Sequence, residues 1–438
     1  MRCDHVRWWA ALATAALGST AGAQTAGNVA PPKAQAWIDV ATYSGMGMPM
    51  GGMGGMGGGG AGASPMSMLG GLLGGGSKGE NRFGNTQSAA AGAWIDVTLM
   101  TRENPSLAQA QQAVPAGFLG APLQLQAPKD VKAPPPDRGD ESEPQEYERP
   151  RGKLLLYWGC GATVRPGQPK VLDMATATPA DLGRFFQSRR ATTRGTHAAP
   201  GRPVWPSPAD KRMVPAGASL VGEHAFSGSG VPEPFRFHIP PAQDLMPPLD
   251  VQQRDNAGAL ELSWRGLPTA RAYFASGMGA AGQNEMVIWT SSEAPDTGFG
   301  LTDYQPNVSI DRWLREKVLL PATATQCTVP KGVFAGEGAM LRLIAYGSEL
   351  NLAHPPRPAD PKQRWEPVWA VKVRVKSVAS LMLGMPSMPG GGQPERGQRS
   401  QQRMPAAADA PPADGQAQEP QQQPGINPLD ALKGIFKR

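Results

Sequence analysis

The pentapeptide AWIDV occurs twice in this chain, starting at Ala36 and again at Ala93. Each copy opens a segment with period-2 alternation and β-branched or aromatic residues, which is typical of a β-strand. Between the copies, residues 45–80 are rich in glycine and methionine and offer little to bury. We therefore expect two similar strands in one N-terminal sheet, joined by an oversized disordered loop whose entropic cost rises only slowly with length.

Similar strand-like segments recur along the chain at turn-separated intervals. In PFRFHIP, Phe235, Phe237 and Ile239 share one face, while Arg236 and His238 share the other. The remaining segments of this kind are KLLLYWGC, ALELSW, ARAYFA, EMVIWTS, MLRLIAY and WAVKVRVKSV. The predicted fold class is mainly β: antiparallel β-sandwich modules joined by long disordered Gly/Met-, Pro- and Gln-rich linkers.

The segment WAVKVRVKSV has the clearest alternation. Apolar residues from Trp369 to Val375 share one face, and Lys372, Arg374 and Lys376 share the other. This pattern predicts an antiparallel strand whose basic face is in water.

Helical signals are few and short. Thr178, Pro179 and Asp181 form a helix start before LGRFF. Ser309 precedes a second short helix over 310–318, and Asn427 precedes a third at the end of the chain.

Composition divides the chain into segments, since glycine (55) and proline (46) are abundant and concentrated in linkers. The expected order is a signal peptide (1–23), N-terminal β segments (24–126) interrupted by the 45–80 loop, a Pro-rich charged linker (127–152), a β-rich middle region (153–250), a β-sandwich (258–383), a disordered tail (390–425) and a short amphipathic helix (426–438).

Within residues 258–383, the segment LELSWRGLPTARAYF places Trp264 and Tyr273 on two successive strands. This region resembles a fibronectin type III or immunoglobulin-like sandwich. The resemblance implies that both aromatic side chains lie in the core between two sheets. It also implies a binding or architectural role and no catalytic residue.

The N-terminus has the features of a secretory signal peptide. Arg2 and Arg7 precede a short apolar run, and a small-residue cleavage site ends at Ala23. No later run approaches about 18 consecutive apolar residues, so a transmembrane span is not expected. The predicted location is the periplasm or outer surface of a Gram-negative bacterium.

The formal net charge of +6 is spread along the chain. Nucleic-acid binders usually cluster their basic residues, so a nucleic-acid partner is not expected.

Two cysteines follow the signal peptide, Cys160 and Cys327. An even pair in an oxidising compartment is a disulfide candidate, while two separately buried thiols are the alternative. The sequence leaves both open.

Methionine is the one potential metal ligand that clusters in the sequence. Met46, Met48, Met50, Met53 and Met56 lie within the glycine-rich tract. Thioether sulfur suits Cu(I), so periplasmic Cu(I) handling is an alternative function, with unselected low complexity as the plain interpretation. No other cofactor is expected.

The last twelve residues form a basic amphipathic segment. Leu429, Leu432, Ile435 and Phe436 are apolar, and Lys437 lies among late basic residues. Such a segment can dock on an envelope protein or a membrane surface, or it can be a frayed tail.

Catalytic patterns are weak. The motif Gly75–Gly79 matches G-x-S-x-G but lacks the strand–helix context that the motif requires. Asp244 and Asp303 are carboxylates that nothing in the sequence pairs, and Glu223 beside His224 would point to the opposite face of a strand. We therefore expect a non-enzymatic envelope binding or assembly component, with an enzyme acting on an envelope polymer as a further alternative.

Overall fold

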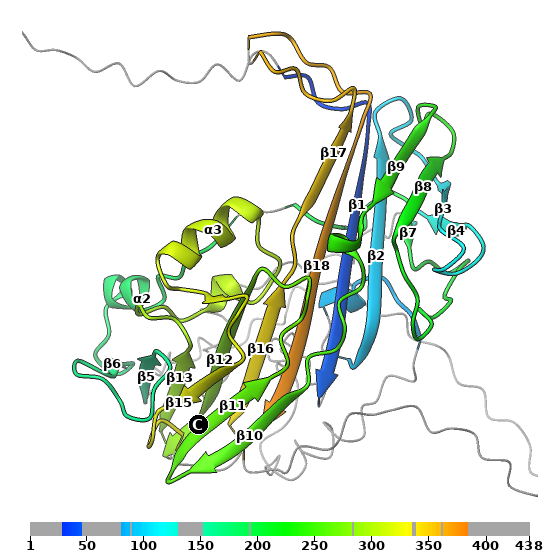
Figure 1. Ribbon diagram of the computed structural model, residues 1–438. Helices are drawn as coiled ribbons and strands as arrows, with labels where there is room; N and C mark the ends of the chain where they lie inside the picture. Colours follow the sequence, from blue (N-terminus) through cyan, green and yellow to red (C-terminus); the bar gives the residue numbers. More distant parts are fainter. Residues whose placement is uncertain are drawn as a thin grey trace, which may run out of the picture.

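The computed structural model describes residues 29–45, 80–87, 90–129, 152–191, 194–282, 284–334, 339–360 and 362–383. Strands dominate this part of the chain, and the helices are short (Figure 1). The prediction of a mainly β protein with few short helices is therefore confirmed.

The first half of the chain supplies the strands β1 (Ala34–Gly45), β2 (Gly92–Thr101), β3 (Gln109–Ala113), β4 (Leu123–Gln126), β5 (Lys153–Trp158), β6 (Lys170–Asp173), β7 (Val204–Trp205), β8 (Gly222–Ser227) and β9 (Phe235–Ile239). The second half supplies β10 (Val251–Asn256), β11 (Ala259–Trp264), β12 (Ala272–Gly282), β13 (Glu285–Thr290), β14 (Leu320–Pro321), β15 (Gln326–Val329), β16 (Met340–Tyr346), β17 (Leu350–His354) and β18 (Trp369–Met382). The helices are α2 (Pro179–Phe185) and α3 (Asn307–Arg315), with 3-10 turns η3 (Asn85–Gln87), η4 (Pro241–Gln243) and η5 (Phe299–Leu301).

One large sheet has the strand order β6-β5-β13-β12-β16-β18-β1-β2-β7-β4-β3-β8-β9. Strands β14 and β17 pair at its side with β12 and β18, and β10, β11 and β15 form a second sheet. Among the described strand pairs, β1 with β18 and β5 with β13 are parallel, and the rest are antiparallel. The large sheet is thus mixed, because its two parallel pairs each join strands that are distant in sequence.

The two AWIDV segments are central neighbours in the large sheet. β1 and β2 are antiparallel, with Ile38 opposite Val97 and Asp39 opposite Asp96. The prediction that both copies contribute to one sheet is confirmed, but the sheet is not N-terminal, since it also contains strands from the second half of the chain. The other neighbour of β1 is β18, so residues near both ends of the described chain meet in the middle of the sheet (Figure 1).

The second sheet packs on one face of the large one, and Figure 1 shows β10, β11 and β15 in front of β12, β16 and β18. Trp264 of β11 and Tyr273 of β12 are buried there, with ring centroids 5.4 Å apart. The large sheet continues beyond residues 258–383 in both directions, since β1 pairs with β18 and β5 with β13.

The opposite face of the large sheet carries a separate core. Ile310 and Trp313 of α3 pack with Phe274, Ile344 and Val378 of three adjacent strands. Because side chains alternate along a strand, this face also receives Lys372, Arg374 and Lys376.

The expectation of a water-exposed basic face on β18 is wrong for Arg374 and Lys376. Arg374 is 5% exposed and Lys376 is 1% exposed. The side chains of β18 do alternate as expected, but the face that carries Arg374 and Lys376 is covered by other parts of the chain. There Arg374 forms an ion pair with Asp39, and Lys376 forms one with Asp303.

Two local predictions are confirmed: Thr178 and Asp181 form a capping box at the start of α2, and β9 buries Phe235, Phe237 and Ile239. The predicted bounds of the second helix are wrong, because α3 spans Asn307–Arg315 and Ser309 lies inside it. Its N-cap is Pro306, so the helix begins without a capping side chain. No helix within the described residues is long and apolar enough to cross a membrane.

Candidate functional site

A group of charged side chains lies on the face of the large sheet that packs against α3, beneath loops that cover this face. Asp39 of β1 receives two hydrogen bonds from the guanidinium of Arg374, from Nε and Nη2 at 2.6 Å each. Thr196 adds its backbone N–H at 2.9 Å and its hydroxyl at 2.7 Å. Both charged side chains are almost fully buried, so this is a bidentate ion pair shielded from water.

A second ion pair lies beside the first. Lys376 Nζ is 3.0 Å from Asp303 Oδ1, and Asp303 also accepts the N–H of Tyr304. Burial alone would raise the pKa of Asp303, but the charges of Lys376 and Arg374 outweigh it and lower this pKa to about 2. The ring of Tyr304 lies 4.3 Å from the Arg374 guanidinium and 4.2 Å from Lys376 Nζ, which adds cation–π attraction.

Asp96 faces Asp39 across β1 and β2, and it accepts hydrogen bonds from Gly84 N–H and from the N–H and hydroxyl of Thr86. Burial raises the pKa of Asp96 to about 7, the hydrogen bonds oppose this shift, and the charge of Asp39 adds to it. Asp96 therefore takes up a proton far more readily than an ordinary aspartate.

We call Asp39, Asp96, Asp303, Tyr304, Arg374 and Lys376 the ionic cluster. Its two cations match two of its three carboxylates, which fits a protonated third carboxylate near neutral pH. Sequence reasoning missed these residues as a set. The signal was present, because an aspartate stands at the same place in both AWIDV copies.

The ionic cluster has the chemistry of a structural core. Asp39 accepts four hydrogen bonds, two from Arg374 and two from Thr196, and these occupy both of its carboxylate oxygens. A Cβ on Gly195 would lie 1.5 Å from Arg374 Nη2, which shows how tightly the covering loop sits. We infer that the ionic cluster has a structural role: it fixes β1, β2 and β18 to the loops that cover them.

Two shallow hollows lie elsewhere on the described surface. One, of about 300 Å³, is lined by four glutamines of β3 and β4 and by five small or apolar residues: Gln109, Gln111, Gln124, Gln126, Ala110, Leu125, Ala209, Ser227 and Gly228. The other, of about 230 Å³, is lined by Gly152, Lys153, Asp173, Asn284 and Glu285. The glutamine-lined hollow contains no carboxylate among its lining residues, so its chemistry is that of hydrogen bonding and not of acid–base catalysis.

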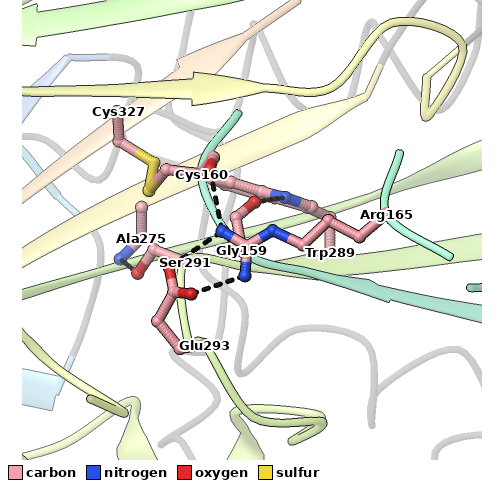
Figure 2. The surroundings of a disulfide bond; sticks show 8 residues. All are labelled: Gly159, Cys160, Arg165, Ala275, Trp289, Ser291, Glu293 and Cys327. Atoms are coloured by element: carbon pink, nitrogen blue, oxygen red, sulfur yellow. Dashed lines mark hydrogen bonds and ion pairs between the residues drawn. A yellow bond between two sulfur atoms is a disulfide. The ribbon is translucent and has the colours of Figure 1, made fainter. Parts of the chain in front are cut away.

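Cys160 and Cys327 form a disulfide, with Cα atoms 5.2 Å apart and a sequence separation of 167 (Figure 2). It joins the loop after β5 to β15, and so links the two sheets. Arg165 supports this loop, donating to the Cys160 carbonyl at 3.1 Å and pairing with Glu293 (Figure 2).

The remaining polar candidates have local partners. Asp244 accepts from Ser219 and from the N–H groups of Leu220 and Leu245, as a loop cap does. His224 is buried, and Leu220 and Gln112 bind its two ring nitrogens. Burial lowers its pKa.

Glu223 points away from His224, as expected, and instead meets His238 on the next strand at 3.0 Å.

Several predicted sites lie outside the described residues: Met46, Met48, Met50, Met53 and Met56, and the tail residues Leu429, Leu432, Ile435, Phe436 and Lys437. Within the described part, no group of three or more His, Cys, Asp or Glu side chains is placed to hold a metal ion.

Comparison with known proteins gives no further guide: no protein-family model matches the chain, and a search of curated proteins found no match.

Proposed function

We propose that this protein is an exported, non-enzymatic component of a Gram-negative cell envelope that binds or helps to assemble other envelope material. The observation that carries the proposal is the Cys160–Cys327 disulfide. Disulfides persist in oxidising compartments such as the periplasm and are rare in the cytosol. The signal-like residues 1–23 are in agreement with this location.

Export is tested by expressing the full chain and a matched chain lacking residues 2–23 in a Gram-negative host. We expect the full chain in the osmotic-shock fraction. After denaturation without reductant, Cys160 and Cys327 should not react with maleimide, because they are joined in the disulfide. The shortened chain should remain in the cytosol with reactive thiols. Full-length protein that stays cytosolic and reduced would contradict the proposal.

A binding role is supported by the glutamine-lined hollow. Gln111 donates its side-chain N–H to the Gln124 side-chain oxygen at 3.2 Å, and both side chains are exposed. Neighbouring primary amides offer paired donors and acceptors without charge, which suits a hydroxyl-rich or amide-rich ligand such as an envelope glycan or peptide. The resemblance to fibronectin-like modules agrees with this role, and the buried Trp264–Tyr273 pair supports the resemblance.

Binding is tested by sedimentation of the purified chain with washed envelope fragments. We expect the protein in the pellet and a loss of at least half of it for the double variant Gln111→Ala/Gln124→Ala. The control Gln252→Ala changes an exposed glutamine on β10, in the second sheet. Equal sedimentation of the double variant and the control would remove the hollow from the proposal.

Docking through the C-terminal segment is a separate part of the proposal. Deleting residues 426–438 should shift the protein from the membrane-associated pool to the soluble pool. A charge-preserving variant, Leu432→Gln/Phe436→Gln, separates the apolar contribution from Lys437. An unchanged distribution for both would contradict a docking role.

The second candidate function is Cu(I) handling by the methionine-rich segment after β1. One observation favours it: Gly45, the last residue of β1, is the register partner of Ser380 in β18. Methionine-rich sequence follows both positions, from Met46 and from Met382. A full-length variant with leucine at Met46, Met48, Met50, Met53 and Met56 should bind fewer Cu(I) ions, and unchanged binding would remove this candidate.

A further inference from the structure

Three described methionines form one row across adjacent strands of the large sheet. Met278 of β12 is the register partner of Met340 of β16, which is in turn the register partner of Met382 of β18. Directly opposite residues in antiparallel strands have Cα atoms about 5 Å apart and point to the same face. The pairing therefore brings three thioether side chains together.

The row lies at the rim of the sheet. Each of its members is four residues from Phe274, Ile344 or Val378, which pack with α3, so alternation puts the row on that same face beyond that core. All three methionines are half-buried, so their side chains are neither sealed in the core nor free in water. Met278 packs against the apolar cluster around Ile288, which anchors one end of the row.

The next row inward consists of Ser276, Arg342 and Ser380, again as register partners. The two rows together offer thioethers, hydroxyls and one guanidinium. Thioether sulfur is a soft ligand that selects Cu(I) over harder ions, so the row favours Cu(I), and the positive charge of Arg342 opposes a divalent ion more than a monovalent one.

We propose that Met278, Met340 and Met382 together bind one Cu(I) ion at this rim. Methionine is unbranched with three rotatable bonds, which lets three side chains spaced about 5 Å apart turn their sulfurs toward a common point. The site uses none of the residues from Met46 to Met56, and it stands independently of envelope binding.

The described end of β1 lies on the strand next to the row. Gly45 is the register partner of Ser380, two residues before Met382. A Cβ at Gly45 would lie 2.0 Å from the Ser380 carbonyl oxygen, so this crossing of β1 and β18 requires glycine.

The test is anaerobic Cu(I) titration of the full chain against a chromophoric Cu(I) chelator. The row variant is M278L/M340L/M382L, in which leucine keeps size and apolarity with little effect on packing. The matched control is M100L/M213L/M246L, which changes three described methionines on separate segments. Near-UV circular dichroism verifies that each variant is folded.

We expect the row variant to bind one Cu(I) fewer per chain than the wild type, and the control to bind the same number. The variant with leucine at Met46, Met48, Met50, Met53 and Met56 should keep the row's ion. Equal binding by the row variant and the wild type would overturn the row site. Loss of all binding in the five-leucine variant would also overturn it, while supporting the segment alone.

A second measurement identifies the ligands directly. With methyl-¹³C methionine, one equivalent of Ag(I), a redox-stable substitute for Cu(I), should shift the ε-methyl resonances of Met278, Met340 and Met382 together. Single leucine variants assign these signals. Shifts confined to other methionines would overturn the site even where the stoichiometry agreed.

Discussion

Asp39 and Asp96 face each other on β1 and β2, yet the two carboxylates are held in different ways. Asp39 forms a bidentate ion pair with Arg374, whereas Asp96 accepts hydrogen bonds from Gly84 and Thr86. One repeated pentapeptide thus supplies a charged carboxylate and a readily protonated one.

The contribution of Asp96 to the stability of the protein should fall as pH rises from about 4 to 8. Asp96 has a pKa of about 7 in the folded protein against an ordinary value of 3.8. Between these values Asp96 binds more protons in the folded state than in the unfolded state, so its contribution to the free energy of unfolding decreases with pH. Asp96→Asn should remove about 1–3 kcal/mol of this decrease. Urea unfolding at pH 5 and pH 8 measures the effect.

The control for this experiment is Asp250→Asn, an exposed carboxylate whose loss should leave the wild-type pH dependence intact. The same pH dependence in the wild type and in Asp96→Asn would show that Asp96 is ionised throughout this range.

Arg374→Met should lower the free energy of unfolding by about 3–5 kcal/mol, because it leaves the Asp39 carboxylate buried without its counter-charge. The double variant Asp39→Asn/Arg374→Met should recover part of this loss. Arg364→Met is a matched control, since Arg364 forms an exposed pair with Glu366 and should cost less than about 1 kcal/mol. Additive losses in the double variant would contradict coupling between Asp39 and Arg374.

Gly195→Ala should destabilise the protein by about 1–3 kcal/mol or more, because the new methyl group would overlap the Arg374 guanidinium and approach Asp39 Oδ2 within 2.7 Å. Gly183→Ala in α2 is the opposite case. A Cβ there meets nothing within 4 Å, and alanine favours a helix, so stability should rise by about 0.5–1 kcal/mol. Thermal melts of the two variants should therefore shift in opposite directions, and an unchanged melt for Gly195→Ala would contradict the packing described.

Replacing both Cys160 and Cys327 with alanine should lower the free energy of unfolding by about 2–5 kcal/mol, because the disulfide closes a long loop and constrains the unfolded chain. Adding reductant should reproduce the loss in the wild type and have no effect on the double variant. Equal denaturation midpoints with and without reductant would show that the bond contributes nothing to stability.

The longer strands, such as β1, β2, β12, β16 and β18, were readable from the sequence because alternation and β-branched residues are local signals. The short strands β3 (QAQQA) and β4 (LQLQ) were not predicted, because glutamine and alanine carry no such signal. The pairing partners were not readable either. β1 pairs with β18 across more than three hundred residues, and nothing in a period-2 pattern specifies a neighbour at that distance.

The same limit explains the error on β18. Arg374 and Lys376 were correctly placed on the face opposite the valines. Whether that face meets water depends on α3 and on the covering loops, which only the tertiary structure reveals. The charged partners, Asp39 and Asp303, are distant from β18 in sequence, so a local pattern could not identify them either.

The parallel pairing of β1 with β18 also affects the order in which the sheet can form during synthesis. During synthesis or translocation from the N-terminus, β1 emerges early, while its central neighbour emerges only after nearly all of the described chain has passed. Until then Asp39 lacks Arg374, 335 residues away, and one edge of β1 has no neighbour from β18. A chain with such distant contacts folds slowly and is open to incorrect strand pairing while it waits, so the last strand to arrive is the one that completes the sheet.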